Sequence, residues 1–321
     1  MSRKLISFII PCYGSEHTIA SVIAEIGQEM GSHPEYSYEI VAVNDASPDN
    51  VWTVLTEIAA DNTHVRLLNL ARNMGKHCAV MAGLNYCSGD IVVLTDDDGQ
   101  CPMNQLWRLI DPLDHGADVA IARYPVKKQS LFKNFGSRIN ARMAEWLIGK
   151  PKDLELSNFL AMKRFICREI IRYPYAFAYL DGIILRTTKY IVNVEMEERE
   201  RLAGETGYTF CKSVSLWLNG FTSFSVKPLR LASLMGCVTA CLGALFGIYV
   251  IIEKLLRPDI LAGYSSLMAV LLFLGGMIMM LLGMLGEYIG RLYICQNKSP
   301  QFVIRDQVNF DADYDDTSTL V

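Results

Sequence analysis

The sequence lacks the motifs that mark several common classes of protein. Neither glycine-rich phosphate-binding motif, GxGxxG or GxxxxGK[ST], is present, which argues against a dinucleotide-dependent dehydrogenase or a P-loop enzyme. The nine cysteines contain no CxxC pair, and neither they nor the five dispersed histidines have the spacing of a zinc site or a disulfide framework. We interpret the cysteines as reduced residues of a cytosolic compartment. No amino-terminal signal peptide is evident, because Met1–Lys4 leads directly into an apolar strand.

Strong positive charge is also absent. The 321-residue chain has a formal net charge of -4 and a pI near 5.8, so no nucleic acid is expected as a partner. Hydrophobic residues make up 51% of the chain, and the mean hydropathy of +0.21 is high for a soluble protein. The excess lies in two nearly uncharged runs at about 231–252 and 265–286, each long enough to cross a bilayer. Their short connecting loop predicts a transmembrane hairpin with both flanks on one side, and the cysteine usage places that side in the cytosol.

Before these runs, short apolar segments alternate with segments of helical periodicity. This alternation predicts βαβ units and an α/β fold with a mainly parallel sheet. The predicted strands are Leu5–Ile10 (stopped by Pro11), Tyr38–Val43, Val65–Leu70, Ile91–Leu94 and Ala117–Ala122, and the predicted helices are His17–Met30, Val51–Ala60, His77–Tyr86 and Met103–His115. Ligands of open α/β sheets bind at the carboxyl ends of strands, so Asp45, Arg72 and Asp96 are expected to gather at one edge as a nucleotide-type pocket.

Three consecutive acids, Asp96, Asp97 and Asp98, follow the apolar run Ile91–Leu94 and precede Gly99-Gln100. Adjacent carboxylates repel one another and are costly to desolvate. A divalent cation shared with a substrate phosphate would remove that cost, and Mg²⁺ or Mn²⁺ prefers such oxygen ligands. The alternative interpretation is a solvated acidic turn that caps the next helix.

The flanks of the hairpin are less regular. Lysines, arginines, aromatics and aliphatic residues alternate between Tyr124 and Lys150. This pattern predicts an amphipathic helix at about 130–149 in the membrane interface, with a second at about 208–221; an ordinary helix packed on the domain is the alternative. The predicted organisation is a cytosolic catalytic domain at 1–228, the hairpin at 229–290 and a cytosolic tail at 291–321 with a disordered acidic stretch at 311–316.

Seven segments in order resemble family 2 glycosyltransferases of the GT-A fold. They are FIIPCYGSE, VNDASPDN, RNMGKHCAVMAGL, GDIVVLTDDDGQ, RLAGETGY, FSVKPLR and GEYIGRLY. More narrowly, the chain is similar to polyprenyl-phosphate sugar transferases, the group of dolichyl-phosphate mannosyltransferase and bacterial undecaprenyl-phosphate glycosyltransferases. The resemblance extends to about Arg305. It implies a Rossmann-like GT-A domain followed by the hairpin. The group often forms tetramers, and the oligomeric state of this chain stays open.

The resemblance also implies a nucleotide-sugar site. Pro11, Tyr13 and Asp45 match positions that hold the base and ribose. Arg72 and Lys76 lie near that pocket with less certain contacts, and Asp97 is assigned to the same nucleotide-sugar site. The bacterial members suggest a UDP-sugar as donor, while the sugar stays open.

Asp96 and Asp98 match the acids of the DxD motif and are expected to bind the metal, with Gln100. Asp97 stands where the family more often has a small residue, and Gly99 replaces the usual leucine; neither change removes a ligand.

The acceptor site is implied in the same way. Arg123 and Lys133 fall where lipid-phosphate-binding arginines lie, although a lysine offers a point charge rather than a bidentate fork. Ser157 matches an SxF pattern. Arg201 matches the arginine of RxxGxS and is grouped with Asp96 and Asp98 as catalytic. The alternatives are a helix cap for Ser157 and a solvated surface charge for Arg201.

The predicted function is a metal-dependent inverting transfer of a sugar from a nucleotide diphosphate-sugar to polyprenyl phosphate, for cell-envelope glycosylation. An ionised phosphate acceptor needs no general base, and no motif for such a base is evident. One alternative is transfer to a lipid-linked saccharide or polysaccharide; a processive synthase is disfavoured by the missing QxxRW motif. Another is a catalytically silent membrane partner. The predicted localisation is the inner or plasma membrane, multi-pass.

Overall fold

The computed structural model describes residues 3–124, 150–175, 179–197, 199, 227–256, 263–297 and 300–310. The chain divides into two compact units, residues 1–208 with 298–321 and residues 209–297. The strands of the first unit are β1 (Lys4–Cys12), β2 (Tyr36–Asn44), β3 (Val65–Leu70), β4 (Ile91–Leu94), β5 (Val119–Arg123), β6 (Leu160–Lys163), β7 (Ile191–Glu195) and β8 (Ile304–Val308). Its helices are α1 (Ile19–Gly31), α2 (Val51–Asp61), α3 (Lys76–Tyr86), the 3-10 helix η1 (Met103–Gln105), α4 (Leu106–Asp114), α6 (Arg164–Ile171) and α7 (Leu180–Thr187).

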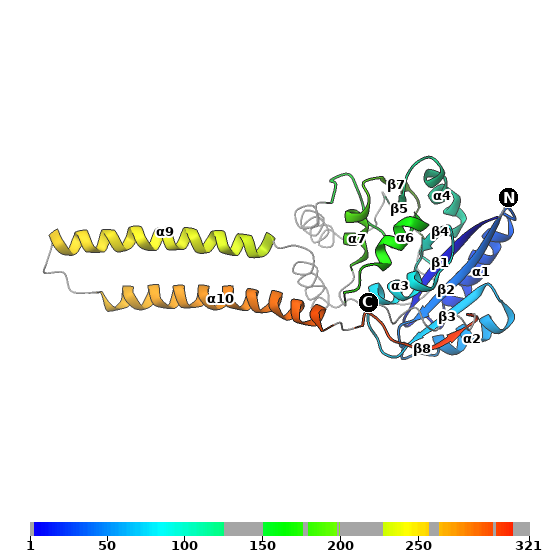
Figure 1. The fold of residues 1–321 in the computed structure, drawn as a ribbon, viewed down its shortest axis with the longest axis horizontal. Helices are drawn as coiled ribbons and strands as arrows, with labels where there is room; N and C mark the ends of the chain where they lie inside the picture. Colours follow the sequence, from blue (N-terminus) through cyan, green and yellow to red (C-terminus); the bar gives the residue numbers. More distant parts are fainter. Residues whose placement is uncertain are drawn as a thin grey trace. The chain divides into compact units, whose positions relative to one another are not determined.

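The described strands form one mixed sheet in the order β7-β5-β6-β4-β1-β2-β3-β8 (Figure 1). Strands β4, β1, β2 and β3 are parallel neighbours, as the βαβ pattern predicted. Strand β6 is antiparallel to β4 and β5, and β8 is antiparallel to β3. Because β1 to β4 run in one direction, their carboxyl ends share one edge.

Two apolar cores lie on the two faces of the sheet. Alternate residues of β1 point to opposite faces, so that Ile6, Phe8 and Ile10 contact one core while Ile9 contacts the other. Helices α1, α2 and α4 supply the first core, and α3, α6 and α7 supply the second. This three-layer packing makes the sheet a rigid platform for the loops at its edge.

The first strand differs from the sequence prediction. Pro11 was expected to stop it, but Pro11 lies inside β1 and is paired with Val43 of β2. On the other side, the ladder with β4 ends at Ile9 and Leu94. Pro11 therefore lies beyond the last residue of β1 that pairs with β4. Because no backbone N–H is needed there to bond with β4, the position tolerates proline.

Strands β6, β7 and β8 were not predicted. Strand β8 has the short, mostly polar sequence IRDQV and lies at the edge of the sheet. Little of it is buried, so its sequence does not alternate between apolar and polar residues. Part of the predicted cytosolic tail at 291–321 thus belongs to the sheet of the first unit. The acidic stretch 311–316 and the interfacial helices predicted at about 130–149 and 208–221 lie outside the described residues.

The second unit contains α9 (Lys227–Leu256) and α10 (Tyr264–Gln296). Both helices extend beyond the predicted runs. The segments Ala232–Tyr249 and Phe273–Gln296 have mean hydropathies of 1.7 and 1.5, and only 6% and 0% of them is buried. By length and composition, each helix could cross a membrane.

All described cysteines are free thiols. Five are buried in the first unit, and Cys87 and Cys167 approach within 3.8 Å (Sγ to Sγ) without a disulfide. The five buried cysteines are core residues as predicted, whereas Cys237 and Cys241 are exposed on α9 and Cys295 is half-buried on α10.

A buried carboxylate joins three strands away from the carboxyl edge. Glu39 of β2 has a side chain only 5% exposed and pairs with Arg66 of β3 at 2.7 Å. The same carboxylate accepts hydrogen bonds from Ser7 Oγ of β1 at 2.5 Å and from the Ser88 N–H at 2.6 Å.

We expect Glu39→Ala to lower the free energy of unfolding by about 3 kcal/mol, because it leaves Arg66, Ser7 and Ser88 without their shared acceptor. Chemical unfolding of the detergent-solubilised chain measures this change. The matched control is Lys4→Ala, which breaks the exposed Lys4–Asp114 pair and should cost less than about 1 kcal/mol. Equal effects of the two substitutions would contradict the prediction.

Candidate functional site

Polar side chains from four neighbouring strand ends are joined by hydrogen bonds at the carboxyl edge of the sheet. Asp45 follows β2, and its buried carboxylate accepts the backbone N–H groups of Met74 at 2.7 Å and Gly75 at 2.9 Å. Gly75 has a φ of +86°, a left-handed conformation suited to glycine, and directly precedes α3. Burial raises the pKa of Asp45, and the two N–H groups oppose that shift. The carboxylate thereby fixes the loop from Arg72 to Gly75, which leads into Lys76 at the start of α3.

The first acid of the DDD run is paired with a cation. Lys76, the first residue of α3, forms a short salt bridge with Asp96 Oδ1, and Asn158 Nδ2 donates to Asp96 Oδ2 at 3.0 Å. These contacts bring the ends of β3, β4 and the segment before β6 together. The expected meeting of Asp45, the Arg72 loop and Asp96 is therefore observed.

Asp97 has a different role from its neighbours. Its carboxylate accepts the Tyr13 N–H at 2.9 Å, and its carbonyl oxygen accepts the Thr18 hydroxyl at 2.6 Å. Burial raises the pKa of Asp97, with the Tyr13 N–H opposing the shift. Asp97 thus holds the loop after β1 against the end of β4. The Tyr13 side chain remains 54% exposed, whereas Pro11 is buried.

Asp98 and Gln100 lie on a turn closed by Gly99, whose φ is +75°. The Gln100 N–H donates to Asp98 Oδ1 at 3.1 Å, and Gln100 Nε2 lies 3.5 Å from the Arg199 carbonyl oxygen. Asp96, Asp98 and Gln100 offer two carboxylates and one amide oxygen, the donor types that Mg²⁺ and Mn²⁺ take. Within the described residues, no group of three or more His, Cys, Asp or Glu side chains could hold a metal ion. Two carboxylates and one amide would leave room in the octahedral coordination shell of Mg²⁺ for water and a substrate phosphate.

Two residues of this site were missed by sequence reasoning. Asn158 contacts Asp96, but the SxF pattern drew attention to its neighbour Ser157 instead. Arg199 presents its carbonyl to Gln100, while its guanidinium is held by Glu25 at 2.8 Å and Asn104 at 2.7 Å. Nothing local in the sequence distinguishes either residue, because both contacts join segments far apart in the chain.

The predicted acceptor residues are only partly described. Lys133 and Arg201 lie outside the described residues. Ser157 caps no helix; its hydroxyl accepts the Phe159 N–H at 3.3 Å in the turn before β6. Arg72 is exposed, and its Nε lies 3.0 Å from the Met74 sulfur.

Arg123, at the end of β5, is already paired. Its Nε donates to Glu155 Oε1 at 3.1 Å, and its Nη1 lies 3.9 Å from Glu195 Oε1. Two carboxylates beside one guanidinium leave a negative local balance. An incoming phosphate would therefore compete with these glutamates for Arg123.

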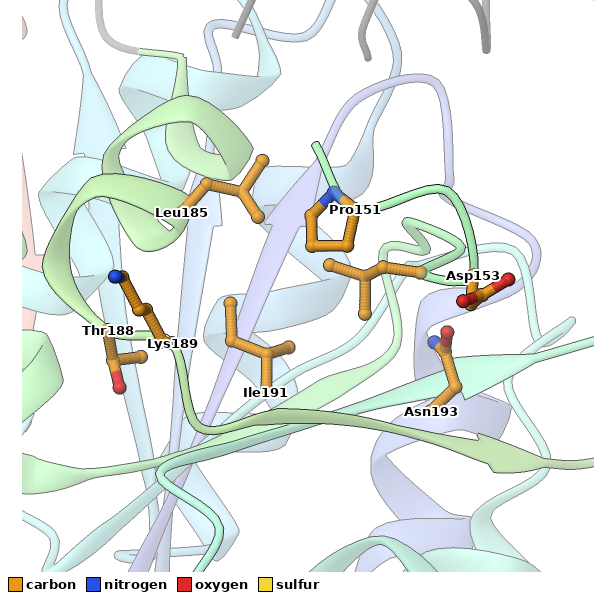
Figure 2. Close-up of a pocket in the computed structure, with 8 residues that line it drawn as sticks. Pro151, Asp153, Leu185, Thr188, Lys189, Ile191 and Asn193 are labelled. Carbon is orange, nitrogen blue, oxygen red and sulfur yellow. The ribbon is translucent and has the colours of Figure 1, made fainter. Parts of the chain in front are cut away.

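A separate cavity of about 460 Å³ lies beside β7 (Figure 2). Pro151, Leu185 and Ile191 face its interior, Asp153 and Asn193 lie at one end, and Thr188 and Lys189 lie at the other. Leu154 completes the lining. No sequence-predicted site residue lines this cavity, so it is distinct from the polar edge.

A cluster of ionisable groups adjoins Lys76. Burial lowers the pKa of His77 to about 4, with the Lys76 charge adding to the effect. The His77 ring meets Tyr179 edge-on, with ring centroids 5.3 Å apart. Burial raises the pKa of Asp181 at the start of α7 to about 6, against the Tyr179 hydroxyl and the Lys76 charge. His77 is therefore uncharged at neutral pH.

Comparison with known proteins supplies the family. The sequence model of glycosyl transferase family 2 matches residues 7–173. This segment contains all the polar residues described above at the carboxyl edge of the sheet except Arg199. The chain belongs to glycosyl transferase family 2. As a family 2 member it is a glycosyltransferase, as predicted. The model of the GtrB C-terminal hairpin matches residues 227–292, which include α9 and most of α10.

Relatives of the family align over almost the whole chain. A prophage bactoprenol glucosyl transferase homolog of Escherichia coli K12 is 32% identical over 94% of this chain and 98% of its own. The undecaprenyl-phosphate 4-deoxy-4-formamido-L-arabinose transferase of Proteus mirabilis is 29% identical over 94% of each chain. The structure of mannosyl-3-phosphoglycerate synthase from Rubrobacter xylanophilus, 17% identical, covers 71% of this chain and 74% of its own with a TM-score of 0.50. The GT-A-like α/β fold is thus confirmed.

His77 should make this glycosyltransferase sensitive to mild acid. The pKa of His77 in the folded chain, about 4, lies below its ordinary value of 6.5. Unfolding therefore takes up a proton between these values, and stability falls as the pH drops from 6.5 toward 4. Asp181 has the opposite sign, because its raised pKa favours the folded chain as the pH falls below about 6.

We expect the melting temperature of the His77→Gln variant to fall less between pH 6.5 and pH 4.5 than that of the unsubstituted chain. Scanning fluorimetry in detergent measures both melting temperatures. The matched control is His17→Gln. Because the His17 side chain is 80% exposed, this substitution should leave the pH dependence of the melting temperature unchanged. Parallel pH dependences of the His77 variant and the unsubstituted chain would exclude this role.

Proposed function

We propose that this enzyme transfers a sugar from a nucleotide diphosphate-sugar, a UDP-sugar by family resemblance, to a polyprenyl phosphate. The observation that carries the proposal is the pair of carboxylates, Asp96 and Asp98, at a sheet edge where Lys76 supplies positive charge. The relatives named for bactoprenol and undecaprenyl phosphate support a lipid-phosphate acceptor. The two apolar helices support a place at the membrane.

The nucleoside would be bound by the loops after β1 and β2. A carboxylate has about four acceptor positions, and two on Asp45 are used by the N–H groups of Met74 and Gly75. The remaining positions suit ribose hydroxyls. The exposed ring of Tyr13, whose backbone is held by Asp97, offers a face for the base.

The diphosphate would lie over Asp96 and Asp98. Mg²⁺ or Mn²⁺ held there with Gln100 would stabilise negative charge on the leaving nucleoside diphosphate, usually the largest contribution to such catalysis. Lys76 would add a second positive charge from the first turn of α3. Asn158 orients Asp96 through its amide.

The acceptor phosphate is ionised at neutral pH, so it can attack the anomeric carbon without a general base. A single displacement of this kind inverts the configuration. Arg123, Ser157, Lys133 and Arg201 are the proposed phosphate-binding residues. We propose a multi-pass protein with its catalytic domain in the cytosol, where nucleotide sugars are available.

Replacing Asp98 tests the donor site. We expect Asp98→Ala to lower the transfer rate at least about 100-fold, because charge on the leaving group loses its counter-ion. The measurement uses purified protein, radiolabelled nucleotide sugars, undecaprenyl phosphate and Mn²⁺, and it counts acid-labile, single-sugar product in the organic phase. The control is Asp111→Ala, an acid 72% exposed on α4.

Undiminished transfer by the Asp98 variant would overturn the assignment of the metal site. In the same assay with membranes added, label found only on a longer glycan would favour a lipid-linked saccharide as acceptor. No product with any donor would favour a catalytically silent membrane partner.

Replacing Glu155 tests the acceptor site. We expect Glu155→Gln to lower the KM for undecaprenyl phosphate roughly two- to fivefold, because Arg123 loses a competing carboxylate that is itself partly exposed. The control is Glu169→Gln, which removes the acid of the exposed Glu169–Arg172 pair. An unchanged or higher KM would show that Arg123 does not bind the acceptor phosphate.

A further inference from the structure

The chain returns to the catalytic unit after the hairpin as a segment at residues 300–310, called here the return segment. Its strand β8 pairs with β3, with Asp306 opposite Asn69 and an irregularity between Asn69 and Leu70. The Ala71 N–H, beside Arg72, donates to the Val303 carbonyl at 2.8 Å. The return segment therefore borders the same strand end that leads into the donor site.

Both ends of the return segment are fastened by side-chain amides. Gln301 Nε2 donates to the carbonyls of Tyr173 at 2.6 Å and Tyr175 at 2.7 Å. Asn309 Nδ2 donates to the carbonyls of Ala59 at 2.9 Å and Val65 at 2.8 Å. These contacts hold β8 independently of Asp306.

A chain of side-chain hydrogen bonds leads inward from Asp306. Asn69 Nδ2 donates to Asp306 Oδ2 at 2.8 Å, and Asn44 Nδ2 donates to Asn69 Oδ1 at 2.9 Å. Asn44 Oδ1 then accepts the Ser47 N–H at 3.1 Å. The chain crosses β3 and β2 and ends in the loop after β2.

That loop holds the donor loop, defined here as Tyr13–Thr18. Ser47 Oγ accepts the Gly14 N–H at 2.8 Å and donates to Asp49 Oδ1 at 2.5 Å. Asp49 Oδ2 accepts the Glu16 N–H at 2.9 Å. On its other side, the donor loop is held by Asp97. The hydrogen-bond chain from Asp306 thus continues through Ser47 to the backbone that carries Tyr13.

The hydrogen-bond chain has a fixed direction. An ionised aspartate only accepts, so Asn69 must turn its NH₂ toward Asp306 and its oxygen toward Asn44. Asn44 must in turn direct its NH₂ to Asn69 and its oxygen to the Ser47 N–H. Asn44 is only 4% exposed, so a reversed amide would leave a buried N–H facing another N–H. The Asp306 carboxylate at the sheet edge and the Ser47 N–H at the other end therefore require the same orientation of the two amides.

We propose that Asp306, in the strand that follows the membrane hairpin, is a positioning residue for the donor loop. It acts through Asn69, Asn44 and Ser47 and touches neither substrate. Its effect on nucleotide-sugar binding rests on the proposed function, whereas its effect on the loop does not.

Hydrogen exchange of the full chain in detergent tests the effect on the loop. We expect Asp306→Ala to speed exchange of the Gly14 and Glu16 amides roughly two- to tenfold, the effect of losing about one net hydrogen bond. Asp306→Asn retains an acceptor oxygen and should restore most of the protection. Asn44→Ala breaks the chain without touching β8 and should match Asp306→Ala at Gly14 and Glu16, while leaving exchange of β8 unchanged.

The control is Gln301→Ala, which loosens the return segment away from Asp306 and should leave the donor loop protected. Faster exchange confined to β8 in Asp306→Ala, or unchanged donor-loop exchange in Asn44→Ala, would overturn the proposal. If Asp306→Ala fails to fold, the Asn44 variant decides.

Kinetics with the nucleotide sugar that supports turnover give the second measurement. We expect Asp306→Ala to raise the donor KM roughly two- to tenfold with a smaller change in kcat. A fall in kcat with an unchanged KM would contradict a positioning role. If no nucleotide sugar supports turnover, the proposed function fails, and the exchange result still decides whether Asp306 positions the loop.

Discussion

Negative charge gathered at one edge of a sheet is the constraint on which this protein depends. Asp45, Asp96, Asp97 and Asp98 all follow parallel strands that end together, and each carboxylate requires a donor or a cation nearby. Backbone N–H groups serve Asp45 and Asp97, and Lys76 and Asn158 serve Asp96. The acids therefore have two kinds of role: Asp45 and Asp97 fix loops, while Asp96 and Asp98 are the ligands that we propose for a metal ion and the donor diphosphate.

This division explains how a run of three acids persists. Asp97 is bonded to two residues of the donor loop: its carboxylate accepts the Tyr13 N–H, and its carbonyl oxygen accepts the Thr18 hydroxyl. The Asp97 carboxylate could not bind a metal ion without releasing the Tyr13 N–H. The neighbours of Asp97 have other partners. Asp98, for example, accepts the Gln100 N–H within the turn that Gly99 makes possible.

Much of the fold followed from periodicity. The segments Val65–Leu70 and Ile91–Leu94 are strands with the predicted bounds, because they are apolar, short and flanked by turn formers. Strands β6, β7 and β8 carry no such pattern, since each is short, partly polar or at an edge. Their conformation comes from pairing with distant segments, which local sequence does not encode. The same limitation hid Asn158, whose partner Asp96 lies far away in the chain.

The sequence by itself determined the parallel core, the acidic edge, the family resemblance and two runs long enough to cross a membrane, because periodicity and local motifs carry that information. The tertiary structure alone decided that Pro11 continues β1, that Arg123 is paired with glutamates, and that the chain after the hairpin completes the sheet. The place of Pro11 depends on where the pairing of β1 with β4 ends, and the pairing of Arg123 depends on which carboxylates the fold brings beside it. Such long-range geometry is fixed only when the chain packs.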